Sequence, residues 1–288
     1  MSVDKLQELI RKTKNPSVID FTLYPQQLPS YLMEAEGTYP KAYFRFCQDL
    51  LLGLKGIVPA VRFSFPFFAL MGLEGLELMP RILTNAKDLG YYVLLDGIDA
   101  LSPQLAQNAA DALMKLPCDG IILSAYIGTD GMKPYVKQLK DSGKSLFVVL
   151  RTANKTAPEL QDLMTGSRLV YMVGAQSANL LGEPLVGKSG YSQIGGLAAA
   201  SSADCLRQLR SKYKRLFLLL DGYDYPNSNA KNCSYAFDQL GHGAAACAGS
   251  SVTTAWRDEQ APENEFVACA VRSAERMKKN ITRYITVL

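Results

Sequence analysis

The fold of this chain is decided by the stretch YYVLLDGIDAL, residues 91–101. Its first five residues are apolar or aromatic, and they end abruptly at a carboxylate and a glycine. Such a short, continuous apolar run is typical of a parallel strand that is buried on both faces. In a barrel of parallel strands, active sites collect at the carboxyl ends of the strands. The stretch therefore predicts a buried strand that delivers Asp96 to this face.

Similar apolar runs alternate with helical stretches along all 288 residues, which predicts strand–helix units around a parallel sheet. No linker interrupts the alternation, so we expect one α/β domain over residues 1–288, closed as a single (β/α)8 TIM barrel. The glycine-rich segment 175–198 is predicted to be a long loop at the carboxyl face. The eight expected strands are Val18–Leu23, Gly56–Ser64, Tyr91–Asp96, Gly120–Ala125, Leu146–Thr152, Leu169–Gly174, Arg215–Asp221 and Ala244–Gly249. The expected helices include 42–54, 70–89, 103–116, 132–142, 158–164, 202–212 and 263–281.

Composition narrows the class of protein. The chain is 48% hydrophobic and 20% charged, with a net charge of +4 and scattered basic residues, so nucleic-acid binding is not expected. No apolar run is long enough to span a membrane, and Met1–Lys14 looks like an amphipathic helix rather than a cleavable signal. The six cysteines are far apart and lack a C-x-x-C pair, which predicts buried free thiols. We expect a cytoplasmic protein without a membrane partner.

Several loop segments match known motifs in the expected order. They are YIGTDGMKPY at 126–135, VLRTAN at 149–154 followed by ELQD at 159–162, the glycine-rich segment 187–200, and VPAVR at 58–62. Together these segments resemble the bacterial long-form (type 2) orotidine 5′-monophosphate decarboxylases. The resemblance covers nearly the whole chain and implies a TIM barrel of pyrimidine biosynthesis that is a homodimeric lyase.

The resemblance also implies a mechanism. That family releases carbon dioxide from orotidine monophosphate without a cofactor or a metal, using a Lys followed by a D-x-K-x-x-D array. A Lys ammonium stabilises the carbanion that develops on the pyrimidine and then protonates it. The last Asp of the array acts across the dimer interface.

Carried over residue by residue, this array is incomplete. The first Lys corresponds to Arg62, a cation without a transferable proton at neutral pH, and the first Asp is retained as Asp96. The central Lys corresponds to Ile98, and the last Asp to Leu101. The ribose-binding Asp, which precedes a proline in the family, corresponds to Tyr24.

The expected ligand site is altered as well. Ala153 replaces a pyrimidine-contacting Ser, and Ser251 stands in place of the phosphate-binding Arg, which is lost. Asp221 and Asp224 lie where a phosphate dianion would bind, so they are expected to repel it. The residues expected to contact a pyrimidine nucleotide or another small phosphate ligand are Thr152, Asn154, Lys188, Ser189, Gly222, Ser250 and Ser251.

Three other interpretations compete for parts of the chain. Residues 182–189 match the phosphate-loop pattern G-x-x-x-x-G-K-S, but Gly190, Gly195 and Gly196 follow where such a loop needs a helix, so we favour a glycine-rich barrel loop. Asp96, Asp99 and Asp221 together would suit Mg²⁺, but we favour the simpler interpretation, in which Asp99 and Asp224 are solvated loop acids. Tyrosines at the rim would stack on a ring ligand or simply pack in the core.

The sequence therefore favours a decarboxylase-like barrel that has lost its decarboxylase activity and acts as a binding or partner subunit. We expect a homodimer, or a heterodimer with an intact paralogue. In this dimer Leu101, in place of the last Asp of the array, would form an apolar contact across the interface instead of a catalytic one. The alternative is a functional decarboxylase or a diverged enzyme acting on a phosphate ligand.

Overall fold

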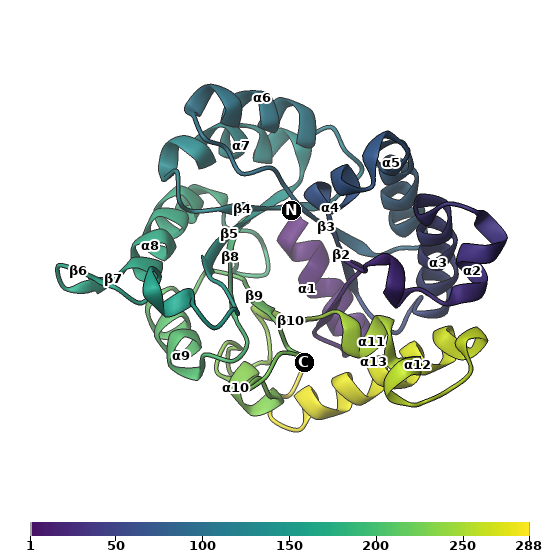
Figure 1. The fold of residues 1–288 in the computed structure, drawn as a ribbon. Helices are drawn as coiled ribbons and strands as arrows, with labels where there is room; N and C mark the ends of the chain where they lie inside the picture. Colours follow the sequence, from purple (N-terminus) through teal and green to yellow (C-terminus); the bar gives the residue numbers. More distant parts are fainter. Residues whose placement is uncertain (1, 288) are drawn as a thin grey trace.

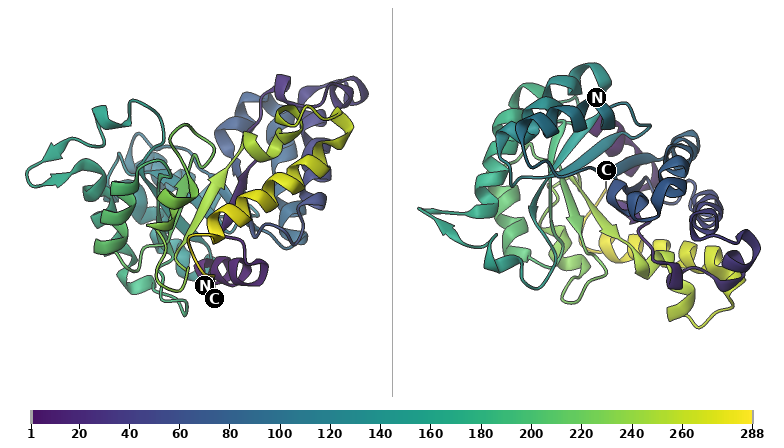
Figure 2. Two further views of the ribbon diagram at one scale, coloured as in Figure 1. Left: turned by 90° about the horizontal axis from the view of Figure 1, so that it is seen from below. Right: turned by 45° about the horizontal axis from the view of Figure 1, so that its top comes forward.

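The computed structural model describes residues 2–287. Within these residues, eight parallel strands form a closed barrel in the order β1-β10-β9-β8-β5-β4-β3-β2, and helices surround it (Figures 1 and 2). The prediction of a (β/α)8 barrel is confirmed. The barrel strands are β1 (Ser17–Asp20), β2 (Ala60–Ser64), β3 (Tyr92–Asp96), β4 (Gly120–Ser124), β5 (Ser145–Arg151), β8 (Ile194–Ala199), β9 (Leu218–Asp221) and β10 (Ala244–Ala248).

Helices connect successive strands, as the parallel arrangement requires. On one side of the barrel lie α2 (Ser30–Glu36), α3 (Tyr39–Gly53), α4 (Phe65–Leu70) and α5 (Gly72–Asp88). They are followed by α6 (Pro103–Leu113), α7 (Thr129–Ser142), α8 (Val170–Gly182), α9 (Ala203–Lys212) and α10 (Ala230–Ser234). The chain ends with α11 (Ser250–Thr253), α12 (Ala255–Asp258) and α13 (Phe266–Thr282), of which α13 runs along the outside of the barrel (Figure 2).

Side chains along each strand point alternately into the barrel and toward the outer helices. In β3, Tyr92 and Leu94 belong to the core inside the barrel, whereas Val93 and Leu95 pack in the outer core. The next residue of the inward series is Asp96. This alternation therefore decides which polar side chains face the carboxyl end of the barrel, which we call the mouth.

Helix α1 (Ser2–Thr13) closes the opposite end of the barrel, which we call the base. The apolar face of this helix, with Val3, Leu6 and Ile10, joins the core inside the barrel. The predicted amphipathic helix is therefore present, and it fills the space that the inward-facing side chains leave at the base.

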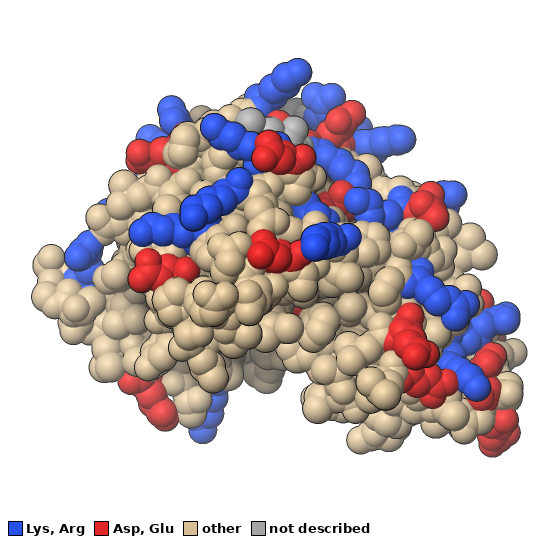
Figure 3. Space-filling view, turned by 90° about the horizontal axis from the view of Figure 1, so that it is seen from above, with Lys and Arg blue, Asp and Glu red and all other residues tan. Residues whose placement is uncertain are grey.

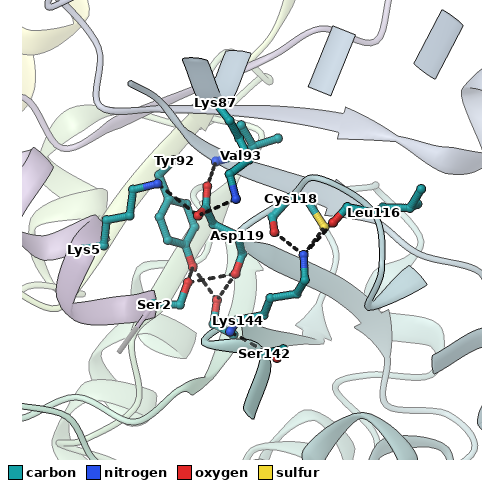
Figure 4. A network of polar contacts seen from close by, with 11 residues as sticks. Ser2, Lys5, Lys87, Tyr92, Val93, Leu116, Cys118, Asp119, Ser142 and Lys144 are labelled. Atoms are coloured by element: carbon teal, nitrogen blue, oxygen red, sulfur yellow. Dashed lines mark hydrogen bonds and ion pairs between the residues drawn. The ribbon is translucent and has the colours of Figure 1, made fainter. Parts of the chain in front are cut away.

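A cluster of polar contacts holds α1 against the base (Figure 4). Asp119 Oδ1 accepts a hydrogen bond from Lys5 Nζ at 3.0 Å and lies 3.5 Å from Lys87 Nζ, while Oδ2 accepts the N–H of Val93 in β3 at 2.9 Å. The Ser2 hydroxyl lies 2.8 Å from both the Tyr92 hydroxyl oxygen and the Asp119 carbonyl oxygen. We call Ser2, Lys5, Lys87, Tyr92 and Asp119 the base cluster.

One expected strand is wrong. After Leu169, the run Leu169–Gly174 forms the start of α8 rather than a barrel strand, and the sixth barrel strand is β8, which begins inside the segment predicted to be a loop. β8 was missed because it contains two glycines and no β-branched run. Those glycines are required by packing, since a Cβ at Gly195 would lie 2.5 Å from the ring of Phe147.

Two expected helices also differ from the structure. The stretch 158–164 forms only a short 3-10 turn at Ala157–Glu159, followed by the hairpin of β6 (Met164–Thr165) and β7 (Arg168–Leu169). This hairpin projects away from the barrel in every view (Figures 1 and 2). The expected helix 70–89 begins earlier and is interrupted at Met71, between α4 and α5.

On the face drawn in Figure 3, basic and acidic side chains intermingle, so no large area carries charges of one sign only. Among residues 2–287, no helix is long and apolar enough to cross a membrane. All six cysteines are buried and free, which confirms the expectation of free thiols.

Candidate functional site

Four charged side chains meet at the mouth, and we call Asp20, Arg62, Asp96 and Asp221 the mouth array. Arg62 Nε and Nη2 donate to the two carboxylate oxygens of Asp96 at 2.8 and 2.9 Å. Arg62 Nη1 donates to Asp221 Oδ1 at 2.6 Å and lies 3.5 Å from Asp20 Oδ2. One guanidinium therefore binds three carboxylates.

The strand geometry explains why these four residues converge. Asp20, Asp96 and Asp221 are the last residues of β1, β3 and β9, and each continues the inward-facing series of its strand. Arg62 does the same in β2, where it is the direct register partner of Asp20. The barrel thus gathers at one point residues that are up to 201 positions apart, between Asp20 and Asp221.

Sequence reasoning paired Arg62 with Asp96 but missed Asp20. The first strand was expected to continue to Leu23, and the ribose-binding position was placed at Tyr24, which is 57% exposed. The strand instead ends at Asp20. The signal was available, because VID, LLD and LLD close β1, β3 and β9 in the same way.

The charges of the mouth array do not cancel. The Arg62 side chain is only 12% exposed, and the three carboxylates are 21–25% exposed. Burial works against the charge of Arg62, but the three carboxylates outweigh it and hold the pKa of Arg62 well above its ordinary value. Burial raises the pKa of Asp96, and Asp20 and Asp221 add to this shift against the opposing effect of Arg62. The array therefore has an excess of negative charge.

Ile98 and Leu101 supply neither a charge nor a proton to the mouth. Both line a separate hollow of about 300 Å³ between the segment after β3 and the start of α7. Among residues 2–287, Arg62 is consequently the only Lys or Arg that forms an ion pair with Asp20, Asp96 or Asp221.

The backbone amides after β10 are occupied by a side chain of the protein itself. Asp224 Oδ2 accepts hydrogen bonds from the N–H groups of Gly249 at 3.0 Å and Ser251 at 3.1 Å, and it lies 3.5 Å from Ser250 Oγ. Gly222, at φ +69°, allows the turn after β9 that brings Asp224 there. Phosphate sites of TIM barrels commonly form at these last two loops. Here the amide groups already bind a carboxylate.

The segment after β5 forms its own hydrogen-bonded unit. The Thr152 N–H donates to Gln161 Oε1 at 2.7 Å, and Thr152 Oγ1 donates to Asn154 Oδ1 at 2.5 Å. Thr152 and Gln161 line a hollow of about 480 Å³ bounded by β5, α8 and the segment after β4, whereas Asn154 does not line it. The segment reaches the mouth, since a Cβ at Gly222 would lie 2.8 Å from Cβ of Ala153.

Lys188 and Ser189 lie at the base, which corrects their expected place in a ligand site with Asp96. They precede β8, and their N–H groups donate to the Asp4 carboxylate of α1 at 3.2 and 2.8 Å. These hydrogen bonds lower the pKa of Asp4 despite its partial burial. No helix follows the loop directly, so the phosphate-loop pattern lacks the helix N-terminus that such a loop needs.

The remaining alternatives receive no structural support from residues 2–287. Within that range, no group of three His, Cys, Asp or Glu residues is arranged to hold a metal ion. Two of the tyrosines expected at the rim lie elsewhere, because Tyr92 is in the base cluster and Tyr91 donates to the Leu51 carbonyl in the outer core. Tyr225, which follows β9, is 52% exposed.

Comparison with known proteins gives a consistent result. The orotidine 5′-phosphate decarboxylase of Clostridium kluyveri is 25% identical over 287 residues, which cover 98% of each chain. The chain is orotidine 5′-phosphate decarboxylase-like over nearly its whole length. The resemblance stated from the loop motifs is confirmed. No family-wide sequence model matches the chain.

Solved decarboxylase structures share the fold. The Plasmodium berghei orotidine 5′-monophosphate decarboxylase has a TM-score of 0.80 at 14% identity and covers 98% of this chain and 97% of its own. The Methanocaldococcus jannaschii enzyme, complexed with the inhibitor BMP, has a TM-score of 0.61 at 13% identity, with 93% and 98% covered.

Proposed function

We propose that this decarboxylase-like protein does not decarboxylate orotidine monophosphate and acts in the cytoplasm as a binding or partner subunit. This proposal rests on the mouth array, in which the Arg62 guanidinium contacts three carboxylates. An arginine cannot donate a proton at neutral pH, so Arg62 does not supply the proton that must replace the departing carbon dioxide.

The electrostatics of the mouth support the same proposal. Orotidine monophosphate carries a carboxylate and a phosphate, and both would approach an array with excess negative charge. Asp224 also fills the amide groups that a phosphate would need. An anion could bind these amides only after displacing the Asp224 carboxylate, and the negative charge of Asp221 nearby would then repel it.

A steady-state assay of the purified chain with orotidine monophosphate tests this proposal. We expect no turnover above buffer, because loss of the charge stabiliser and proton donor removes several kcal/mol of transition-state stabilisation. Ile98→Lys alone should not restore activity, since Leu101 and Asp224 remain. Turnover of about one per second, ordinary for an enzyme, would instead support the alternative that the chain is a functional decarboxylase, as its curated relatives are named.

The partner role rests on exposed apolar side chains beside the mouth. Leu101 is 91% exposed and Tyr126 is 88% exposed, and both belong to the rim of one hollow. Exposed apolar surface costs about 25 cal/mol for each Å². We propose that a second copy of the chain, or an intact decarboxylase subunit, covers this rim.

Sedimentation across a dilution series measures this association. Leu101→Asp should shift the chain toward monomer, because a charge would be buried without a partner. Leu52→Asp is the matched control, since Leu52 is 65% exposed on α3, outside this rim, and its replacement should leave the association unchanged. A wild-type chain that is monomeric at tens of micromolar, alone and mixed with an intact decarboxylase, would remove the support for a partner role.

A further inference from the structure

A hollow on the outside of the barrel is lined by basic residues and by no acidic ones. It lies between the β6–β7 hairpin, the start of α8 and the exposed face of α9, and it encloses about 600 Å³ (Figure 1). Three cations line it, Arg168, Arg207 and Lys212, and none of the described residues in its lining is an Asp or a Glu. Its apolar side chains are Met164, Leu169 and Met172. The hollow therefore has an uncompensated positive charge beside apolar surface.

The excess of positive charge extends along the chain segments that form the hollow. Residues 163–182 contain no Asp or Glu, and neither do residues 205–220. The same two segments contain six basic residues, namely Arg168, Arg207, Arg210, Lys212, Lys214 and Arg215. Arg210 is held by the carbonyl oxygens of Ala236 and Gly243 at 2.6 and 2.7 Å, whereas the other five are exposed. Charges of one sign gathered in this way raise the local concentration of ions of the opposite sign.

The three cations of the hollow are open to a ligand. Among residues 2–287, neither Arg168 nor Lys212 forms an ion pair, and Arg168 Nη1 donates only to the neutral Gln176 side chain. Arg207 Nη1 donates to Asp204 at 2.8 Å, but the Asp204 side chain is 85% exposed. Such an exposed ion pair contributes little, because water competes for both groups. An anion in the hollow would therefore compete with Asp204 for Arg207 at little cost.

Another surface hollow shows how this chain balances such charges elsewhere. The hollow between α3 and α5 has a volume of about 610 Å³ and is also lined by three basic residues. Three glutamates line it as well, and Lys41 Nζ lies 3.8 Å from Glu74 Oε1. The two hollows thus have similar volumes and equal numbers of cations, and they differ in whether acids compensate those cations. Only the hollow beside α9 leaves that compensation to a ligand.

We propose that the hollow beside α9 binds a small anion that carries a diphosphate group. Guanidinium groups bind phosphate oxygens through paired N–H donors, which suits Arg168 and Arg207, and Lys212 adds a third positive charge. The volume of about 600 Å³ lies within the usual range of small-molecule sites. The three apolar side chains would contact the remainder of the ligand. The site is separate from the mouth array, so the proposal does not depend on whether the chain decarboxylates orotidine monophosphate.

Titration of the full chain with pyrophosphate, followed by NMR of labelled methionine methyl groups, tests the proposal. Met164 and Met172 line the hollow, so we expect their signals to shift, whereas the buried Met277 of α13 should not respond. Pyrophosphate should bind in the millimolar range or more tightly. Phosphate at equal ionic strength should bind at least about fivefold more weakly, because it reaches fewer of the three cations. Equal affinities for the two anions, or no shift at Met164 and Met172, would overturn the proposal.

Variants of exposed residues assign the contacts without disturbing the core. Arg168→Gln and Lys212→Gln should each weaken pyrophosphate binding about fivefold. Arg168→Lys keeps the charge but loses the paired donors, so it should lose less than Arg168→Gln. Lys41→Gln, at the balanced hollow, and Lys231→Gln, at a hollow beside α10, are the matched controls and should bind as the wild type does. If Arg168→Gln or Lys212→Gln also binds as the wild type does, the hollow is not the diphosphate site.

An acidic peptide is the competing occupant of a basic surface hollow. Hexaglutamate has charges of the same sign as pyrophosphate, but they are spread along a flexible chain that must be ordered on binding. At equal ionic strength we therefore expect it to bind more weakly than pyrophosphate and to shift the signals of Met164 and Met172 less. Tighter binding of hexaglutamate at the same two methionines would assign the hollow to a protein partner and would contradict the proposal of a diphosphate site.

Discussion

The two ends of the barrel hold clusters of charged side chains with opposite excess charge. At the base, one carboxylate, Asp119, meets two lysines, and a backbone N–H completes its hydrogen bonding. At the mouth, one guanidinium, Arg62, meets three carboxylates. The base cluster therefore has an excess of positive charge on two lysines that are 42% and 36% exposed, whereas the mouth has an excess of negative charge around a guanidinium that is only 12% exposed. Excess charge costs more stability where the charged groups are buried. Because active sites of TIM barrels lie at the carboxyl end, we infer that the mouth is the end shaped by function.

Removing the central group at the mouth should have the largest effect. Arg62→Met leaves three carboxylates without a cation, and we expect a loss of about 3–5 kcal/mol in the free energy of unfolding. Urea denaturation measures it. Adding Asp96→Asn should recover only part of the loss, because Asp20 and Asp221 remain uncompensated. A complete recovery would reduce the array to a simple Arg62–Asp96 pair.

Removing the central charge at the base should cost less. Asp119→Asn keeps the shape and an acceptor for the β3 N–H but loses both lysine contacts, so we expect a loss of about 1–3 kcal/mol in the same measurement. Lys5→Met is the control, because Lys5 is 42% exposed and Lys87 remains, and its loss should be below about 1 kcal/mol. Equal losses for Asp119→Asn and Arg62→Met would erase the contrast between the two ends.

Some elements of the barrel could be predicted from the sequence, and others could not. β3 and β9 were predictable because an unbroken apolar run ends on an aspartate in each. α8 was mistaken for a strand because a short apolar run does not distinguish a buried helix from a buried strand. β8 required knowledge of Phe147, a neighbour 48 residues before Gly195 that no local pattern contains.

The same limit applies to the site. The Arg62–Asp96 contact followed from neighbouring strands with one charge each. That Asp224 would bind the amides of Gly249 and Ser251 did not follow, because it depends on the turn that two separate loops make in space. For the same reason, nothing local showed that Lys188 belongs to the base.

The occupied amides at the mouth offer a third test. Wild-type protein should bind uridine monophosphate weakly or not at all. Asp224→Ala empties the amides and removes a charge, so we expect affinity to rise about tenfold, or about 1.4 kcal/mol. Asp224→Asn still fills them and should bind little better than wild type. Calorimetry distinguishes the three proteins, and micromolar binding by the wild type would show that the mouth tolerates a phosphate as it stands.

The smallest expected effect concerns pH. Because the pKa of Asp96 is raised in the folded state, the folded chain takes up a proton at a higher pH than the unfolded chain does. Ionisation of Asp96 therefore costs stability near neutral pH, and this cost is relieved as pH falls toward the ordinary carboxyl value of about 4. The stability of wild type relative to Asp96→Asn should rise over that interval and level off below it. An opposite slope would mean that Arg62 outweighs the combined effect of burial and the other two carboxylates on the pKa of Asp96.

The projecting β6–β7 hairpin gives the molecule a place where its chain can be cut without opening its barrel. Its tip at Gly166 and Ser167 lies outside the helical layer, while β5 before it and β8 after it are joined by their own hydrogen bonds. Exposed tips of this kind are preferred sites of proteolytic nicking. A single cleavage would yield two pieces, ending at 166 and beginning at 167, that stay associated through the barrel. The protein is therefore suited to being split there into complementing halves, each carrying part of the mouth array.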